Sequence, residues 1–298
     1  MFNKTLKKLS TSWHADYLRN MDQVVEHYRQ FNDVEYIPDI PYKSQDGTDL
    51  AMDIYRPAIS DGHPYPVVLM VHGGGFLMGD RHMEMGICRH FAQAGFLSVS
   101  LEYRVFPKVD VTGAVLDLAG GMEHIGRTAS DYGGDVGHIY LSAESAGVYA
   151  AIFAASMNWS ETVKQIIGGR DPGIRIRAMA AVSGMFYVNK KDMVGMVMGG
   201  NIIPGSWRKG EIRKTMSMES DEIVRCLPPV FLVSSKGDFL RKYTLQYSDF
   251  LKEQEKEYRL VYYDKGKKLI HAFPSLTPEI PESIAVDEMI ASWFLEHE

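Results

Sequence analysis

The sequence predicts an α/β fold with a mainly parallel central sheet and helices on both faces. Continuous apolar runs such as YPVVLMVH (65–72) and FLSVSLEY (96–103) are typical of strands covered on both sides. Helical stretches lie between these runs, and this alternation indicates βαβ units. The chain has 298 residues, of which 45% are hydrophobic and 23% charged, so it can bury the core of one large domain.

The elements follow in a regular order. QDG (45–47) is a turn signal between the first two expected strands. The last expected helix places five apolar side chains on one face, namely Val286, Met289, Ile290, Trp293 and Phe294. We expect strands at 34–44, 49–57, 65–72, 96–103, 138–144, 176–183, 229–235 and 258–264, and helices at about 84–94, 112–127, 145–157, 241–256 and 282–297.

Two segments depart from the alternation. Residues 1–31 predict a helix with an apolar face made of Phe2, Leu6, Leu9, Trp13 and Tyr17. We expect this face to pack on the main domain, although a basic amphipathic helix can also lie on a membrane surface. Residues 184–226 are too long for a simple connection and are rich in methionine, so they indicate a mobile lid or an insertion that extends the core.

Composition excludes several classes of protein. The net charge of −6, from 32 basic and 38 acidic side chains, argues against nucleic acid as a partner. Cys88 and Cys226 make neither a disulfide framework nor a metal site, and the ten histidines lack zinc-ligand spacing, so we expect no metal. There is no apolar run of 18 residues for a membrane span and no signal-peptide pattern, which predicts a cytoplasmic protein.

Three consecutive glycines follow the apolar run that ends near His72. Ordering three consecutive glycines costs more conformational entropy than ordering other residues. HGGGF (72–76) therefore indicates a loop whose backbone, without side chains, closely approaches another group. The N–H groups of such a loop can point at an oxyanion, as in acyl-transfer enzymes. The alternative is a tight structural turn.

The sequence SAESAG (142–147) is typical of a strand-to-helix turn that presents a nucleophilic serine, Ser145. The positions two before and two after the serine must be small. Gly147 meets this demand, and Ala143 adds only one methyl group to the usual glycine. The alternative is that Ser145 merely caps a helix.

A nucleophilic serine needs a histidine base and an acid that orients it. In this kind of sheet the order along the chain is serine, acid, histidine. Asp238 follows the strand at 229–235, and His271 follows the strand at 258–264, so both are expected at the carboxyl edge of the sheet. Asp264 and Glu279 are rival acids, but the first ends its own strand and the second comes after the histidine.

From about residue 46 to its end, the chain resembles the hormone-sensitive-lipase-like branch of the α/β-hydrolases. The matching segments, in order, are DLAMDIYRP, VVLMVHGGGF, GD, LEYRVFP, GGD, SAESAG, KGDFL and HAF. The resemblance implies an α/β-hydrolase fold with a helical cap. It divides the chain into 1–45, with N-terminal cap helices and the first strand, and 46–298, the hydrolase domain with a cap insertion at about 184–226.

The resemblance also implies roles for single residues. Ser145 would be the nucleophile, His271 the general base and acid, and Asp238 its orienting partner. The backbone N–H groups that form the oxyanion hole would be those of Gly74, Gly75 and Ala146. His72 would support the glycine loop, and the expected pocket residues are Phe76, Glu144 and Met185.

Four positions depart from the family pattern, and none removes a reacting group: Ala143, Val148, Glu102 and Phe76. We therefore expect a carboxylesterase that hydrolyses small, short-acyl esters without a cofactor. An amide or peptide hydrolase with the same triad and a non-catalytic ligand-binding member of the fold are the alternatives. The sequence is compatible with a homo-oligomer, and it does not define the physiological substrate.

Overall fold

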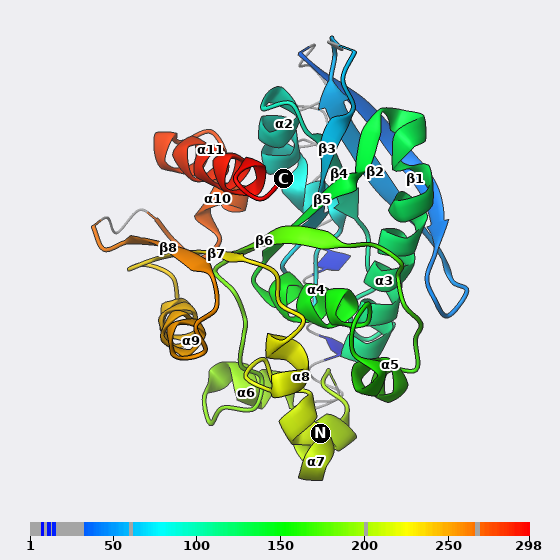
Figure 1. Cartoon of the computed structure of the whole chain (residues 1–298). Coiled ribbons are helices and arrows are strands. Elements are labelled where there is room, and N and C mark those ends of the chain that lie inside the picture. Colours follow the sequence, from blue (N-terminus) through cyan, green and yellow to red (C-terminus); the bar gives the residue numbers. More distant parts are fainter. Residues whose placement is uncertain are drawn as a thin grey trace.

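The computed structural model describes residues 7–8, 11–12, 14–15, 33–59, 62–199, 202–265 and 269–298. Its centre is a twisted eight-stranded sheet in the order β1-β2-β4-β3-β5-β6-β7-β8 (Figure 1). Within the described chain, β2 alone pairs antiparallel with both of its neighbours, and the pairs from β4 to β8 are parallel. The strands are β1 (Val34–Lys43), β2 (Asp49–Pro57), β3 (Tyr65–Val71), β4 (Leu97–Leu101), β5 (Gly134–Glu144), β6 (Ile176–Val182), β7 (Val230–Ser235) and β8 (Tyr258–Tyr263).

Helices cover both faces of this sheet, as predicted. Helices α2 (Met85–Gln93) and α11 (Pro281–Leu295) pack on one face, and α3 (Val111–Thr128), α4 (Ala146–Ser156) and α9 (Arg241–Glu253) contribute to the core on the other. The shorter helices are η1 (Arg81–Glu84), η2 (Ala129–Tyr132), α5 (Glu161–Ile167) and α10 (Phe273–Leu276).

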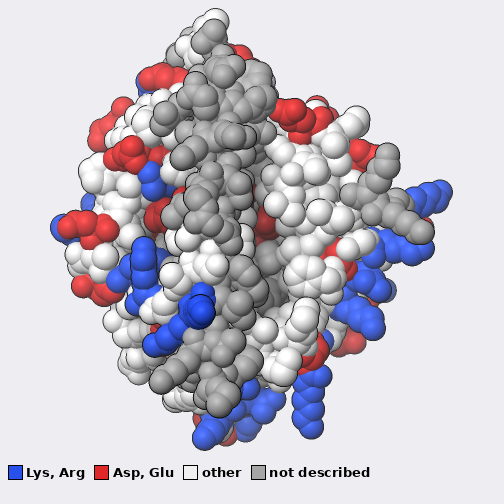
Figure 2. All heavy atoms as spheres, turned by 180° about the vertical axis from the view of Figure 1, so that it is seen from behind, with Lys and Arg blue, Asp and Glu red and all other residues white. Residues whose placement is uncertain are grey.

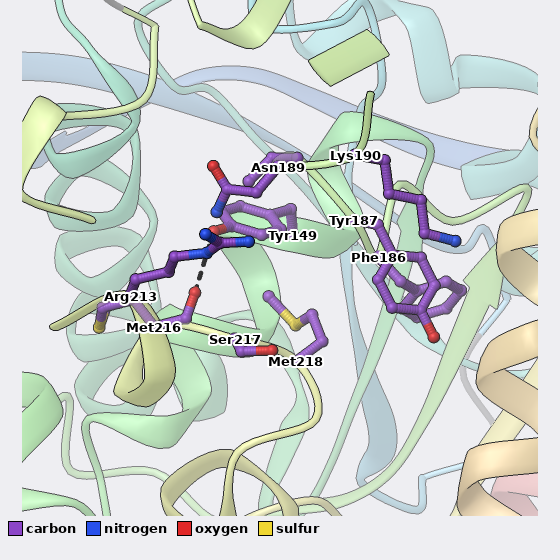
Figure 3. Close-up of a pocket in the computed structure, with 10 residues that line it drawn as sticks. Tyr149, Phe186, Tyr187, Asn189, Lys190, Arg213, Met216, Ser217 and Met218 are labelled. Carbon is purple, nitrogen blue, oxygen red and sulfur yellow. Dashed lines mark hydrogen bonds between the residues drawn. The ribbon is translucent and has the colours of Figure 1, made fainter. Parts of the chain in front are cut away.

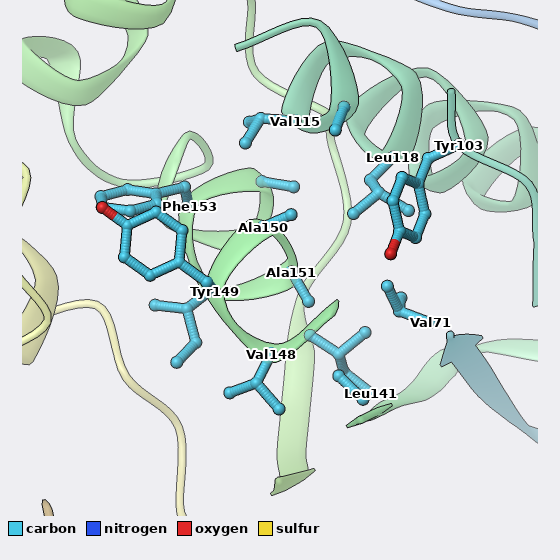
Figure 4. Packing of buried hydrophobic residues seen from close by; sticks show 14 of the residues in the cluster. Val71, Tyr103, Val115, Leu118, Leu141, Val148, Tyr149, Ala150, Ala151 and Phe153 are labelled. Carbon is cyan, nitrogen blue, oxygen red and sulfur yellow. The ribbon is translucent and has the colours of Figure 1, made fainter. Parts of the chain in front are cut away.

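Alternate residues of the central strands enter two separate apolar cores. In β3, Val67 and Leu69 belong to the core under α3 and α4, whereas Val68 and Met70 belong to the core under α2 and α11. Figure 4 shows part of the first core, where Val71 and Leu141 of neighbouring strands face side chains of α3 and α4. Burial on both faces explains why these strands are continuous apolar runs.

The segment 184–226 folds into short helices below the sheet in Figure 1: α6 (Met193–Met198), η3 (Gly205–Arg208), α7 (Gly210–Thr215) and α8 (Asp221–Val224). Its buried apolar side chains, Met198, Ile202, Trp207, Met216 and Met218, join the core that contains α3 and α4. The insertion therefore contributes to the core. That it also moves as a lid stays a prediction. The expected N-terminal helical face lies outside the described residues.

Cys88 and Cys226 are both free thiols. Among the residues that the structure describes, no helix has the length and apolar character needed to cross a membrane. Figure 2 shows the molecule from behind, where acidic and basic side chains both lie around the margins of the face.

Candidate active site

Ser145 lies in a strained turn between β5 and α4. Its φ of +50° and ψ of −117° are values that residues other than glycine rarely adopt. Two backbone hydrogen bonds hold it, from the Ser145 N–H to the Val182 carbonyl and from the Met185 N–H to the Ser145 carbonyl, both 2.9 Å. The Ser145 side chain makes no capping hydrogen bond to α4, so the alternative of a simple helix cap is wrong.

The backbone at the end of β3 lies so close to Gly147 that this position, two residues after the serine, must be small. A Cβ atom on Gly147 would lie 2.3 Å from the carbonyl oxygen of His72 and 2.7 Å from that of Val71. Position 143 is different, because Ala143 sits within β5, paired in register with Val71 and Ala181. A methyl group is accommodated there.

The structure brings together the three side chains that the sequence predicted. Ser145 Oγ lies 2.9 Å from Nε2 of His271, and His271 Nδ1 lies 2.6 Å from Oδ1 of Asp238. Asp238 is fully buried and accepts further hydrogen bonds from the Ser234 hydroxyl (2.7 Å) and the Leu240 N–H (2.8 Å). Burial alone would raise the pKa of Asp238, but its hydrogen bond to His271, the charge of that residue and the other two donors hold the pKa below its usual value.

Direct contacts fix the loops that carry Asp238 and His271. Gly237 forms a parallel bridge with Ile270, and the Ser235 hydroxyl donates to the Leu269 carbonyl at 2.5 Å. The Ala272 N–H donates to Ser183 Oγ at 3.0 Å, which ties the histidine loop to the end of β6. These contacts place the imidazole over Ser145.

The glycine loop begins directly after β3. Gly74 has a φ of +90°, and a Cβ atom there would lie 1.9 Å from the carbonyl oxygen of Met78. Its own carbonyl accepts from the Leu77 and Met78 N–H groups at 3.0 and 3.2 Å. Ala146 is the first residue of α4, so its N–H has no acceptor within the helix. Gly74 and Gly75 line the same cavity as Ser145.

His72 supports this loop from inside the protein. Its ring stacks on Tyr103 at 4.0 Å between centroids and 10° between planes. The Tyr103 hydroxyl donates to the carbonyl oxygens of His72 (2.9 Å) and Gly73 (2.8 Å). Burial lowers the pKa of His72 to about 4, so the ring is neutral near pH 7. The structure thus places His72 where the resemblance implied.

A cavity of about 440 Å³ opens over Ser145 and His271. Its walls are almost entirely apolar and come from the glycine loop, α6 and the loop after β7. The Phe239 ring packs on that of His271, 4.1 Å between centroids. The remaining lining residues are Leu77, Met78, Met83, Glu144, Met185, Met193, Val194, Val197, Met198, Leu240, Ala272 and Leu276.

Two of the three expected pocket residues line this cavity. Glu144 and Met185 line the cavity. Phe76 does not, because its φ is +58° and its buried ring packs edge-on against Tyr103, 6.2 Å between centroids. Phe239 and the residues of α6 were not predicted from the sequence, although the methionine-rich run MVGMVM was a signal for an apolar wall.

A smaller cavity of about 170 Å³ lies between α4 and the insertion (Figure 3). Tyr149 and Phe186 form part of its wall, and the Tyr149 hydroxyl donates to the Met216 carbonyl at 3.3 Å. None of the residues Ser145, Asp238 and His271 lines it. Among the described residues, no group of three or more histidine, cysteine or acidic side chains could hold a metal ion.

A family model, BD-FAE, matches residues 52–234, which is more than half of the chain and includes the glycine loop and Ser145. The chain belongs to the BD-FAE family. The matched region ends before Asp238 and His271.

Curated relatives match over part of their length. Esterase LipI of Mycobacterium tuberculosis is 25% identical over 218 residues, which cover 66% of this chain and 63% of LipI. A probable isoprenylcysteine alpha-carbonyl methylesterase, ICME of Oryza sativa subsp. japonica, is 33% identical over 103 residues, which cover 35% of this chain and 25% of that protein. The chain thus spans less than two thirds of the length of these relatives.

Solved structures match over nearly the whole chain. Esterase B of Lactobacillus rhamnosis, with a tributyrin phosphonate inhibitor, superposes with a TM-score of 0.83 at 21% identity, covering 98% of this chain and 94% of that one. Esterase LipW of Mycobacterium marinum gives a TM-score of 0.79 at 16% identity, with coverage of 97% and 90%. These likenesses confirm the predicted α/β-hydrolase fold.

Proposed function

We propose that this protein is a serine carboxylic-ester hydrolase that acts through an acyl-enzyme intermediate. One observation carries the proposal: Ser145 Oγ, the His271 imidazole and the Asp238 carboxylate form a continuous hydrogen-bonded chain, 2.9 and 2.6 Å long at its two links. This chain lies at an apolar cavity that also contains the glycine loop. The geometry is that of a nucleophile with its base and the group that orients the base.

The reaction follows from these contacts. Ser145 Oγ attacks the ester carbonyl carbon while His271 Nε2 takes the hydroxyl proton. When the tetrahedral intermediate collapses, His271 returns that proton to the departing alkoxide and the alcohol leaves. A water molecule then attacks the carbonyl carbon of the acyl-enzyme while His271 takes its proton. When the second tetrahedral intermediate collapses, His271 returns the proton to Ser145 Oγ and the acid is released. Asp238 keeps the Nδ1–H tautomer and stabilises the imidazolium.

The oxyanion would be held by the N–H groups of Gly74, Gly75 and Ala146. They come from two segments, the loop after β3 and the start of α4, that meet beside Ser145. The N-terminus of α4 adds a favourable dipole for negative charge. Loss of one such donor typically lowers turnover by roughly 10²–10³.

The lining of the cavity favours binding of an uncharged, apolar acyl group. Its lining is apolar apart from Glu144 and the reacting groups, so a charged acyl chain would lose hydration without gaining a partner. The esterase B structure with a tributyrin phosphonate supports the same class, short-chain esters, by similarity of fold. We therefore propose small, short-acyl esters as substrates.

We propose that the chain lies in the hormone-sensitive-lipase-like branch. Residues 1–45 would hold N-terminal cap helices and the first strand, and residues 46–298 the hydrolase domain, whose insertion at about 184–226 completes the cap. We also propose a cytoplasmic protein without a nucleic-acid partner. Size-exclusion chromatography with light scattering decides whether it forms a homo-oligomer.

The direct test is hydrolysis of p-nitrophenyl butyrate by Ser145→Ala. We expect kcat to fall by roughly 10⁴–10⁶ while circular dichroism stays unchanged, because only the nucleophile is removed. Ser206→Ala, at an exposed position of η3, is the matched control and should keep wild-type turnover. Full activity of Ser145→Ala would refute the proposal, and faster cleavage of the matched anilide by the wild type would make the protein an amidase.

A further inference from the structure

Three buried carboxyl groups occur in succession from the serine turn toward α11. Glu144 precedes Ser145, Glu84 ends η1, and Asp287 lies in α11; their exposed fractions are 4%, 1% and 3%. Within the described part of the chain, each has one buried oxygen without a hydrogen-bond partner: Oε2 of Glu144, Oε1 of Glu84 and Oδ1 of Asp287. Buried polar atoms are normally paired, so these three require an explanation.

Glu144 lies against the glycine loop. A Cβ atom on Gly73 would be 2.9 Å from Oε1 of Glu144 and 3.2 Å from Cβ of Ser145. The Glu144 side chain also lines the cavity over Ser145. Its carboxyl group is therefore next to the backbone that would hold the oxyanion.

Glu84 connects this carboxyl to the histidine loop. The Ser275 hydroxyl of α10, four residues after His271, donates to Oε2 of Glu84 at 3.2 Å. A negative charge on Glu84 would raise the pKa of Glu144 and of the Cys88 thiol of α2. Glu84 thus contacts the segment after His271 and interacts electrostatically with the residue before Ser145.

Other ionisable groups act electrostatically on the two glutamates. The charge of Asp238 raises the pKa of Glu144, and that of Asp287 raises the pKa of Glu84. Both glutamates also act on the buried Tyr103 hydroxyl. Asp287 has a hydrogen-bond partner, because its Oδ2 lies 2.7 Å from Nδ1 of His90.

Burial disfavours negative charge on the two glutamates. It raises the pKa of Glu84 to about 8, with a further contribution from Asp287. Burial, followed by the charges of Glu84 and Asp238, raises the pKa of Glu144 well above its usual value. Burial therefore favours the protonated, neutral form of both side chains.

We propose that Glu144 and Glu84 are positioning residues: a pair of neutral carboxylic acids that supports the glycine loop, and whose ionisation stops turnover by placing negative charge beside the forming oxyanion. This inference rests on the proposed esterase activity. A negative charge in a dry site opposes a developing oxyanion much more than it opposes binding of a neutral ester. Ionisation of the pair should therefore lower kcat and leave KM nearly unchanged.

The test is the pH profile of kcat and KM for p-nitrophenyl butyrate, from about pH 6 to about pH 10, in the wild type and in Glu84→Gln/Glu144→Gln. We expect kcat of the wild type to fall about ten-fold per pH unit once the pair ionises. The double variant cannot ionise at these positions, so its kcat should stay level over the same range. Glu253→Gln, at an exposed position of α9, should reproduce the wild-type profile.

An alkaline fall that is identical in the double variant would overturn the inference, as would a folded double variant with no activity at pH 7. If the double variant does not fold, the infrared C=O band of protonated carboxyl groups in the wild type is decisive. Loss of this band in step with kcat supports the inference, and its absence at pH 7 contradicts it. A wild type that cleaves no ester at any pH would refute the proposed function instead.

Discussion

At the scale of single residues, the serine turn depends on how closely α4 approaches β3. Gly147 lies against the carbonyl oxygens of Val71 and His72, which are backbone atoms and cannot rotate away. We predict that Gly147→Ala destabilises the protein by about 1–3 kcal/mol, because a forced contact in a packed core costs that much. Urea unfolding measures this change.

Gly205→Ala is the control, since a Cβ atom at that position meets nothing within 4 Å. It should leave the free energy of unfolding within about 0.5 kcal/mol of wild type. Equal effects of the two substitutions would contradict the close approach of α4 to β3.

The orientation of the histidine is a second residue-level prediction. Asp238→Asn removes the acceptor for the Nδ1–H group of His271 and favours the wrong tautomer. We expect kcat to fall by about 10⁴ with little change in KM. Steady-state kinetics on p-nitrophenyl butyrate checks this, and a variant within ten-fold of wild-type kcat would show that Asp238 does not orient the base.

Reacting residues could be predicted from the sequence because their chemistry restricts the residue type and their order along the chain. The position of Phe76 could not, because a φ of +58° turns that residue into the core against Tyr103. The electrostatic interaction between Glu84 and Glu144 was equally hidden, since the two positions are distant in sequence and buried acids leave no sequence pattern.

At the scale of elements, α6 forms one wall of the cavity. Val194 and Val197 line the cavity, whereas Met196 of the same helix is 63% exposed and lies outside it. We predict that Val197→Phe shortens the acyl chain that fits, lowering kcat/KM for the octanoate ester by roughly ten-fold relative to the acetate ester. A series of p-nitrophenyl esters measures the ratio.

Met196→Phe places the same ring on the outer side of α6 and should leave the chain-length profile unchanged. An unchanged profile in Val197→Phe would mean that the acyl group does not lie against α6. The proposal that the 184–226 segment forms the cap would then lose its main support.

The long elements could be predicted because their periodicity is set by burial. All eight expected strands are present, with bounds that differ by a few residues, and the last helix buries the predicted side chains except Met289, which is half-buried. The short helices α5 and α10, of seven and four residues, were missed because such lengths are too short to show a helical period.

At the scale of the whole molecule, the buried acids make stability depend on pH. The folded protein keeps the proton of Glu84 up to about pH 8, whereas the unfolded chain releases it near its usual pKa of about 4.5. Stability therefore falls as pH rises between these values, by at most about 1.4 kcal/mol per pH unit for one group.

We predict that Glu84→Gln flattens this fall. Its free energy of unfolding, from urea titrations at about pH 5, 7 and 9, should change less between pH 5 and 9 than that of the wild type. Parallel pH dependences in the two proteins would contradict a protonated Glu84 in the folded state.

The overall topology explains why distant residues converge. The loops after β3, β5, β7 and β8 all leave the same carboxyl edge of the sheet, so a parallel arrangement predicted from apolar runs was sufficient to bring them together. The details of the cavity depend on packing within the insertion, which composition alone does not specify.

The most direct measurement of the central claim is covalent labelling with a butyryl-like phosphonate, followed by intact-mass analysis and peptide mapping. A serine activated by its neighbours displaces the phosphonate leaving group. We predict one phosphonyl group per chain, attached to Ser145, and none in Ser145→Ala. An unlabelled wild type, or a label carried by another residue, would contradict the account.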